Sequence, residues 1–133
     1  MQKLSPEVER FLKREKLIGK IATVMKDGSP HVTPIWYTVE DGKIVINTTT
    51  ERVKYFNIKR DDRVCFLVED GYPHVIVFGR ARLAPERDGK KDIETLAIMY
   101  TGEAQGRKSA REIYWKQPRA TIEITPERVV SGL

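Results

Sequence analysis

Residues 21–50 read IATVMKDGSPHVTPIWYTVEDGKIVINTTT, with two Asp-Gly pairs set between runs of β-branched and aromatic residues. Asp-Gly favours a tight hairpin, because both central residues of a type I′ turn need positive φ. We therefore predict one hairpin at Asp27-Gly28 and another at Asp41-Gly42. Turns this short join antiparallel strands. Three strands are expected, over residues 17–26, 31–39 and 43–48.

Pro34 lies inside the second of these strands. A proline has no N–H to give to a neighbouring strand, so within sheets it is confined to edges and bulges. We predict an edge or a bulge at Pro34. Irregular strands of this kind often border a ligand site.

The remaining chain adds three strands, over residues 63–69, 74–83 and 120–125, the last ended by Pro126. Six strands around one core predict a mainly β protein, a small antiparallel barrel with flanking helices. The length of 133 residues fits one domain over residues 1–133.

Four helical segments are expected beside the strands. Ser5 as cap and Pro6 at the first position predict the start of one helix. The others are predicted over residues 51–59, 92–100 and 109–115. Thr50 is the expected cap of the second, Val53, Phe56 and Ile58 its core face, and Gly102 and Gly106 are expected to frame a loop before the last.

Composition limits the classes of function. The net charge of +5 favours an anionic partner, which is a phosphate, a nucleotide cofactor or a nucleic acid. No apolar run approaches the ~20 residues of a membrane-spanning helix, and the N-terminus lacks a signal-peptide core, so no membrane association and a cytoplasmic location are expected. Cys65 is the only cysteine, which excludes an internal disulfide and a site of several thiolates.

No catalytic residue can be assigned from motifs. The two histidines and one cysteine have no zinc-site spacing, so no metal site is predicted. The nucleophile elbow, Walker and dinucleotide-binding patterns are also absent. His31 and His74 are candidates for a general base or, more simply, half-exposed packing residues, and Cys65 is expected to be buried and inert.

The segment from Asn47 to Lys54 is the best candidate for a ligand site. It joins the end of a strand to the start of a helix, where backbone N–H groups and the helix dipole favour an anion. Three consecutive threonines with Arg52 and Lys54 would complete a phosphate site. The alternative is a Thr-capped helix with a solvated basic face.

The order of motifs along the chain resembles the pyridoxamine 5′-phosphate oxidase-like, FMN-binding split-barrel family, and most of all its short deazaflavin (coenzyme F-420) dependent members. The resemblance covers roughly residues 5–131. It implies a split β-barrel that works as a homodimer, with FMN or coenzyme F-420 at the subunit interface. The motifs that carry it lie at residues 21–24, 28–37, 47–48, 54–58, 62–64, 79–81 and 126–131.

The resemblance also implies which residues bind the cofactor. The strand with Val32, Thr33, Pro34, Ile35 and Trp36 is expected along the isoalloxazine ring. Asn47, Thr48, Thr49, Arg52 and Lys54 are expected at the phosphate end, and Arg80, Trp115 and Arg119 are expected from the second subunit.

Three functions follow from these features. The first is an oxidoreductase that transfers a hydride to or from a small organic substrate. Vitamin B6 oxidation is not expected, because the sequence lacks the C-terminal substrate segment of true pyridoxamine phosphate oxidases. The second is a flavin storage module with little turnover. The third, ranked last, is a nucleic-acid-binding barrel, based on the charge and on Trp36, Tyr37 and Tyr72. For the polyglutamyl tail of coenzyme F-420, the candidates are Lys59, Arg60, Arg80 and Arg82.

Overall fold

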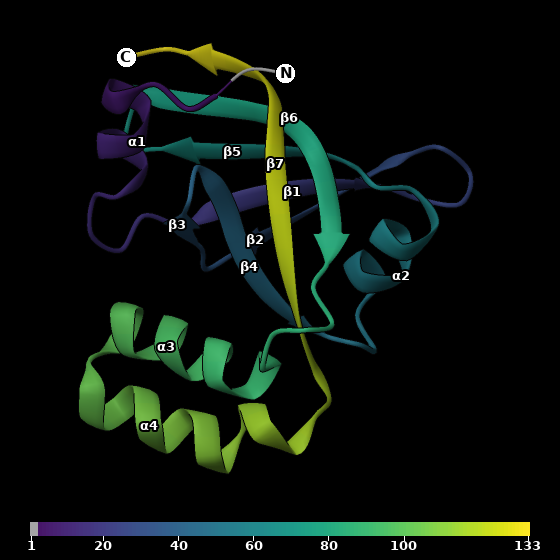
Figure 1. The fold of residues 1–133 in the computed structure, drawn as a ribbon, viewed down its shortest axis with the longest axis vertical. Helices are drawn as coiled ribbons and strands as arrows, with labels where there is room; N and C mark the ends of the chain where they lie inside the picture. Colours follow the sequence, from purple (N-terminus) through teal and green to yellow (C-terminus); the bar gives the residue numbers. More distant parts are fainter. Residues whose placement is uncertain (1–2) are drawn as a thin grey trace.

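The computed structural model describes residues 3–133. Seven strands form one antiparallel sheet in the order β2-β1-β5-β6-β7-β4-β3, with helices around it (Figure 1). The predicted mainly β fold with flanking helices is therefore confirmed. The elements are α1 (Pro6–Leu12), β1 (Gly19–Val24), β2 (Pro30–Ile35), β3 (Thr38–Glu40), β4 (Lys43–Thr49), α2 (Val53–Arg60), β5 (Arg63–Glu69), β6 (His74–Leu83), α3 (Gly89–Thr101), α4 (Glu103–Glu112), the 3₁₀ turn η1 (Tyr114–Lys116) and β7 (Arg119–Ser131).

The seventh strand arises because the strand predicted over residues 31–39 is two strands. β2 pairs with β1, whereas β3 pairs with β4, so consecutive strands lie at opposite ends of the sheet order. The chain crosses from one edge to the other at Trp36 and Tyr37. Tyr37 is buried, and its hydroxyl donates to the carbonyl of Leu12, which fixes this crossing.

The core lies on the inner face of the rolled sheet. Alternate residues of the strands point inward, and Ile21, Phe66, Val77 and Ile124 are at most 1% exposed. Burying a side chain of this size stabilises the fold by about 1.5–3 kcal/mol. Helix α1 covers one end of this core with its own apolar face.

The two predicted hairpins exist, but they differ in turn geometry. Asp41 and Gly42 both have positive φ, at 51° and 73°, as a type I′ turn requires. At the first turn only Gly28 does, and its N–H donates to the carbonyl of Met25. The expectation of a type I′ turn at Asp27-Gly28 is therefore wrong.

Helix α2 begins later than predicted. Arg52 occupies the N-cap without a side-chain hydrogen bond, so the expectation that Thr50 caps this helix is wrong. The expectation that Val53 and Phe56 face the core is also wrong, and only that for Ile58 is confirmed. Asn57 and Ile58 are buried, whereas Val53 and Phe56 are 45% and 52% exposed.

The region expected as a loop around Gly106 belongs to α4. A Cβ at Gly106 would lie 2.5 Å from the backbone nitrogen of Ile98, so glycine permits the close packing of α4 on α3. Strand β7 also continues past Pro126, contrary to prediction. Pro126 pairs with Gly79 at a register shift, an irregularity that tolerates proline.

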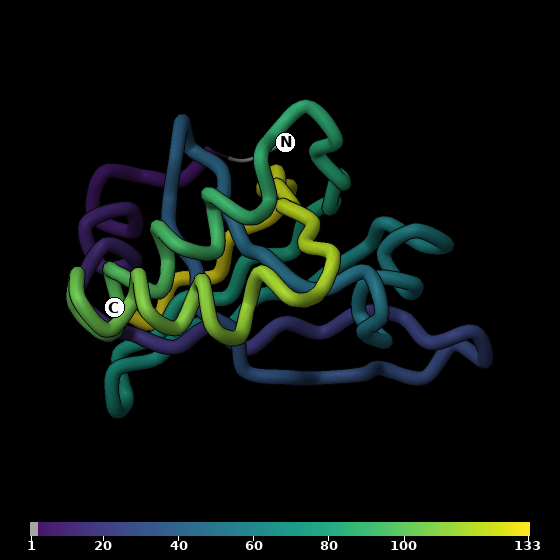
Figure 2. The backbone as a smooth tube through the Cα atoms, turned by 90° about the horizontal axis from the view of Figure 1, so that it is seen from below, coloured from purple at the N-terminus to yellow at the C-terminus, as the bar shows by residue number. Residues whose placement is uncertain are grey.

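Figures 1 and 2 show the arrangement around the sheet. Helices α3 and α4 lie side by side next to the first residues of β7. Helix α2 lies near the last residues of β4. In Figure 2 the β1–β2 hairpin forms a long arm along one side of the molecule. Within residues 3–133, no helix is long and apolar enough to span a membrane.

Candidate functional site

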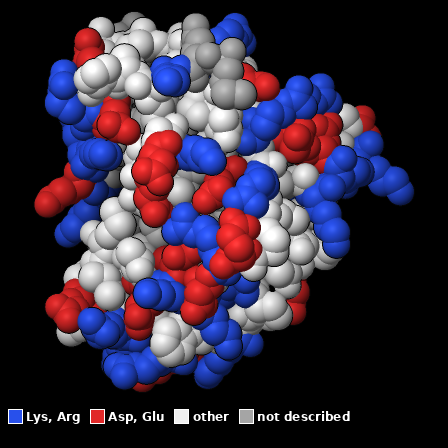
Figure 3. Space-filling model, viewed as in Figure 1, with Lys and Arg blue, Asp and Glu red and all other residues white. Residues whose placement is uncertain are grey.

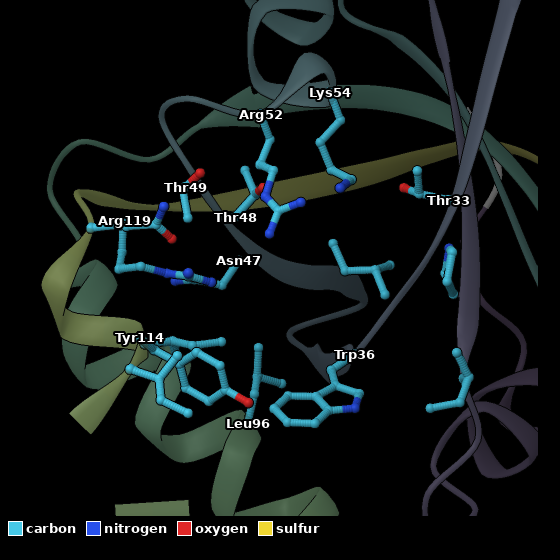
Figure 4. Close-up of a pocket in the computed structure, with 16 residues that line it drawn as sticks. Thr33, Trp36, Asn47, Thr48, Thr49, Arg52, Lys54, Leu96, Tyr114 and Arg119 are labelled. Carbon is cyan, nitrogen blue, oxygen red and sulfur yellow. The ribbon is translucent and has the colours of Figure 1, made fainter. Parts of the chain in front are cut away.

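A cavity of about 620 Å³ opens between β2, the end of β4, the start of α2, helix α3 and the segment that leads into β7 (Figure 4). Its volume falls in the range of small-molecule sites. The lining side chains are Ile18, Thr33, Pro34, Ile35, Trp36, Asn47, Thr48, Thr49, Arg52, Lys54, Ile93, Leu96, Ile113, Tyr114, Gln117 and Arg119.

Three basic residues form one end of this cavity, which we call the cationic end. Arg52 precedes α2, Lys54 lies in its first turn, and Arg119 begins β7. Figure 4 shows the side chains of Arg52 and Lys54 directed from α2 into the cavity. The register of β4 and β7 brings the third close, because Thr49 pairs with Arg119.

The cationic end carries uncompensated positive charge. Burial, followed by the charges of Arg52 and Arg119, lowers the pKa of Lys54 from its ordinary value. Burial and then Arg52 lower the pKa of Arg119 in the same way. No carboxylate among residues 3–133 forms an ion pair with any of the three, and none lines the cavity. Such a group of cations favours a bound anion.

Charged side chains elsewhere are arranged differently. Figure 3 shows acidic and basic groups interleaved on the face seen in Figure 1. Arg82, for example, bonds to both Glu86 and Glu123, and Arg87 bonds to Asp92. The cationic end is therefore distinguished by three cations that line one cavity in which no carboxylate of residues 3–133 lies.

Asn47 fixes Arg119 at this end. The buried amide oxygen of Asn47 accepts a hydrogen bond of 2.9 Å from Nε of Arg119. Its Nδ2 donates to the carbonyl of Gly89 at 2.8 Å and to the hydroxyl of Thr121 at 3.3 Å. The guanidinium of Arg119 also lies 5.7 Å from the ring centroid of Tyr114.

The opposite end of the cavity is aromatic and apolar. Trp36 stacks on Tyr100 with ring centroids 5.1 Å apart, and Tyr114 meets Trp36 edge-on at 6.1 Å. Figure 4 places Trp36, Tyr114 and Leu96 together, away from Arg52 and Lys54. One cavity thus offers positive charge at one end and a flat apolar surface at the other.

Strand β2 forms a free edge of the sheet beside the cavity, as Pro34 predicted. Met25 N–H donates to the carbonyl of Ser29 at 2.8 Å, so these two residues form a hydrogen-bonded pair. Hydrogen-bonded and non-hydrogen-bonded pairs then alternate along β1 and β2. Val32 and Pro34 belong to non-hydrogen-bonded pairs, so their backbone groups face away from β1. The hydroxyl of Thr33 is buried and has no hydrogen-bond partner in the structure, and Figure 4 shows it directed into the cavity.

Most of the predicted site residues come together in this cavity. Ten of them line it, and Arg119, which was expected from a second subunit, does so in its own chain. Val32, Arg80 and Trp115 do not line it. The side chain of Val32 is 60% exposed, Arg80 pairs with Asp62 and Glu127, and the ring N–H of Trp115 donates to the carbonyl of Lys90.

Six lining residues were not predicted. They are Ile18, Ile93, Leu96, Ile113, Tyr114 and Gln117. Ile93 and Leu96 belong to the apolar stripe of α3, and both are buried. No local pattern distinguishes a helix face that packs on the core from one that borders a cavity.

The structure gives little support to the other candidates. Trp36 lies against Tyr100 and Tyr37 is buried, so among the three aromatics considered for nucleic acid only Tyr72 is strongly exposed, at 85%. Arg82 and Arg80, considered for the F-420 tail, already have carboxylate partners. Burial raises the pKa of the Cys65 thiol, which disfavours a reactive thiolate.

The family model for pyridoxamine 5′-phosphate oxidase matches residues 4–131. Among solved structures, an F420 reductase is 27% identical with a TM-score of 0.73, over 95% of this chain and 98% of that chain. A conserved hypothetical protein from Mycobacterium tuberculosis is 27% identical with a TM-score of 0.71, over 97% of this chain and 82% of that one. These matches confirm the predicted split barrel, here with seven strands.

The same fold also occurs in proteins with a different role. The heme storage protein HutZ from Vibrio cholerae is 17% identical with a TM-score of 0.70, over 98% of this chain and 95% of that chain. At this identity the likeness shows the fold alone. Function must therefore be argued from the cavity.

Proposed function

The chain belongs to the pyridoxamine 5′-phosphate oxidase family, whose split barrel is a flavin-binding fold, and we propose that it is an oxidoreductase that binds FMN or the deazaflavin coenzyme F-420. Its reaction is the transfer of a hydride to or from a small organic substrate. The observation that carries the proposal is the two-ended cavity, in which Arg52 and Lys54 lie opposite Trp36, while Arg119, the third cation without a carboxylate partner, lies beside Tyr114. Both cofactors combine a phosphate with a flat tricyclic ring.

The residues of the cavity fit such a group. Arg52, Lys54 and Arg119 would hold the phosphate by charge-assisted hydrogen bonds. The free edge of β2 and the partnerless hydroxyl of Thr33 supply hydrogen-bonding groups for the polar rim of the ring. When bound, the flavin or deazaflavin supplies the hydride chemistry, and the protein supplies binding and orientation.

The side chains that line the cavity provide little acid–base chemistry of their own. Its titratable groups are Arg52, Lys54, Tyr114 and Arg119, with no histidine, cysteine or carboxylate. Ile93 and Leu96, both buried, make one wall of the cavity apolar. Reactions that require only hydride transfer and a proton from solvent suit this lining best.

We also propose a homodimer that uses the outward face of the sheet. In register across β2, β1, β5 and β6, this face carries Val32, Ala22, Cys65 and Phe78. Sheet faces exposed to water are usually polar, yet these side chains are apolar and only partly buried. A second copy would cover them and bring its Arg80 and Trp115 toward the cofactor, as the family resemblance implies.

Two measurements test this function. Mass spectrometry of the cofactor released from the natively purified protein should give FMN or coenzyme F-420. The loaded protein should then catalyse reduction of a small organic acceptor, such as a quinone, with the matching reductant.

The alternative is a storage module, which also binds the cofactor. Cofactor release without turnover on any tested acceptor would favour storage. A protein that is free of cofactor and binds neither FMN nor coenzyme F-420 in titrations would contradict both functions.

A further inference from the structure

We propose that Asp92 is a positioning residue for Arg119, acting through Thr121 and Asn47. It lies in the first turn of α3, outside the lining of the cavity. Its role toward a bound phosphate rests on the function proposed above. The hydrogen-bond chain that it controls exists in the protein without ligand.

The chain of contacts is continuous. Asp92 Oδ2 accepts a hydrogen bond of 2.7 Å from Thr121 Oγ1. Thr121 Oγ1 accepts one of 3.3 Å from Asn47 Nδ2, and Asn47 Oδ1 accepts one of 2.9 Å from Arg119 Nε. Asn47 is 5% exposed and Thr121 2%, so water does not compete at these two residues.

The polarity of this chain is set at Asp92 together with the carbonyl of Gly89, which accepts a hydrogen bond of 2.8 Å from Asn47 Nδ2. A carboxylate only accepts hydrogen bonds, so the single proton of the Thr121 hydroxyl must point toward Asp92. The oxygen of Thr121 is then left to accept from an N–H, so Thr121 and the carbonyl of Gly89 both hold the amide nitrogen of Asn47 on their side. The amide oxygen of Asn47 consequently faces Arg119.

Asp92 is itself held by Arg87. Nε and Nη2 of Arg87 donate to its two carboxylate oxygens at 2.9 and 3.3 Å. Arg87 also bonds to Glu40 and Glu123, so it keeps two acidic partners if Asp92 is replaced. A substitution at Asp92 should therefore disturb the chain to Arg119 more than the local fold.

The consequence lies in how Arg119 presents its charge. Asn47 occupies Nε of Arg119, while within residues 3–133 its two terminal nitrogens have no hydrogen-bond partner. They are available to an anion in the cavity. Asn47 is neutral, so it orients the guanidinium without cancelling its charge, as an aspartate at the same position would.

Asp92→Asn tests the proposal because it keeps the shape of the side chain and adds a donor. Glu86→Gln is the matched control, since Glu86 accepts from Arg82 but has no bond to Thr121. Thr121→Val removes the hydroxyl and serves as a second break in the chain. The first measurement is the ¹H–¹⁵N signal of Arg119 Nε–H in ligand-free protein.

We expect this signal to shift or broaden in Asp92→Asn and Thr121→Val and to stay in place in Glu86→Gln. We also expect Asp92→Asn to bind FMN about three- to tenfold more weakly, the loss expected for one hydrogen bond. Its affinity for riboflavin, which lacks the phosphate, should not change.

An Arg119 signal that is unchanged in folded Asp92→Asn and Thr121→Val would overturn the positioning role, whatever the wild type binds. A signal that moves in a protein with no affinity for FMN or coenzyme F-420 would support the positioning role and contradict the proposed function. The two proposals therefore fail separately.

Discussion

Lys54 combines a partly buried position with two neighbouring cations. These surroundings lower its pKa from the ordinary value of 10.5, with burial the larger cause. An anion bound at the cationic end would raise the same pKa again, because opposite charge favours the protonated amine. Affinity for the anion is therefore coupled to the protonation of Lys54.

The coupling predicts how FMN binding depends on pH. Affinity should be fully developed below the pKa of Lys54 in the free protein and should decrease as pH rises through that value. Lys54→Arg should bind FMN with no decrease over the same range, because arginine stays protonated. Fluorescence titrations at a series of pH values measure this, and parallel curves for the two proteins would contradict it.

Replacing Thr33 should change stability and ligand affinity in opposite directions. Its hydroxyl is buried without a partner, a state that costs about 1–3 kcal/mol. Thr33→Val removes this group at nearly constant shape, so the ligand-free protein should become more stable toward denaturant. Affinity for FMN and riboflavin should fall together if the hydroxyl bonds to the ring. A variant with lower stability, or with unchanged affinity for both ligands, would show that the hydroxyl has another partner.

Under the proposed function, strand β2 is the element on which binding of the cofactor ring depends. Pro34 lies in a pair that is not hydrogen-bonded to β1, so its nitrogen faces the free edge beside the cavity. Pro34→Ala adds an N–H at that edge. We expect weaker binding of FMN and riboflavin alike and a shift in the absorbance of the bound ring. The ratio of FMN affinity to riboflavin affinity, which measures the phosphate contribution, should stay the same.

Pro30→Ala is the matched control for this change. Pro30 lies in an equivalent pair of β2 but does not line the cavity. Its replacement should leave spectrum and affinity as they are. If Pro34→Ala also left them unchanged in a folded, soluble protein, the edge would only protect the sheet from aggregation.

Elements with strong local signals were predictable from the sequence. Ser5 accepts a hydrogen bond from the N–H of Val8 at the start of α1, and β5 and β6 begin and end where the pattern placed them. Boundaries set by tertiary contacts were not predictable. The crossing at Tyr37 depends on a hydrogen bond to Leu12, far away in the sequence. The continuation of β7 past Pro126 depends on a register shift against Gly79.

The candidate site divides in the same way. Its strand residues and two of its three cations belong to contiguous segments, Thr33 to Trp36 and Asn47 to Lys54, which carry recognisable chemistry, whereas Arg119 comes from β7. The wall from α3 and the turn before β7 comes from segments whose apolar residues look like ordinary core. Only the packing of α3 beside β4 and β7 brings them to the cavity.

Ion pairs link charged side chains on the outside of the molecule, as among Arg82, Arg87 and Glu123. The outward face with Val32 and Phe78 carries these apolar side chains between ion pairs such as Lys20 with Glu69 and Arg80 with Asp62, and it is the surface proposed for the second copy.

Dimer formation can be tested at Val32. Its side chain is 60% exposed in one subunit, so Val32→Asp should fold normally but place a charge in the interface. Light scattering should give twice 15.3 kDa for the wild type and a monomer for the variant. Tyr72→Asp, at a side chain 85% exposed on a turn, should remain a dimer. A monomeric wild type at micromolar concentration would contradict the shared site.

The function proposed here requires that the cationic end recognise the phosphate of the cofactor. The affinities of wild type, Lys54→Ala and the control Lys59→Ala for FMN and riboflavin measure this directly. Lys59 lies on the same helix but outside the cavity. The wild type and Lys59→Ala should prefer FMN strongly. Lys54→Ala should lose about ten- to a hundredfold in FMN affinity, the value of one charge-assisted contact, with riboflavin binding unchanged. Equal FMN affinity in all three folded proteins would place the phosphate elsewhere and contradict the account.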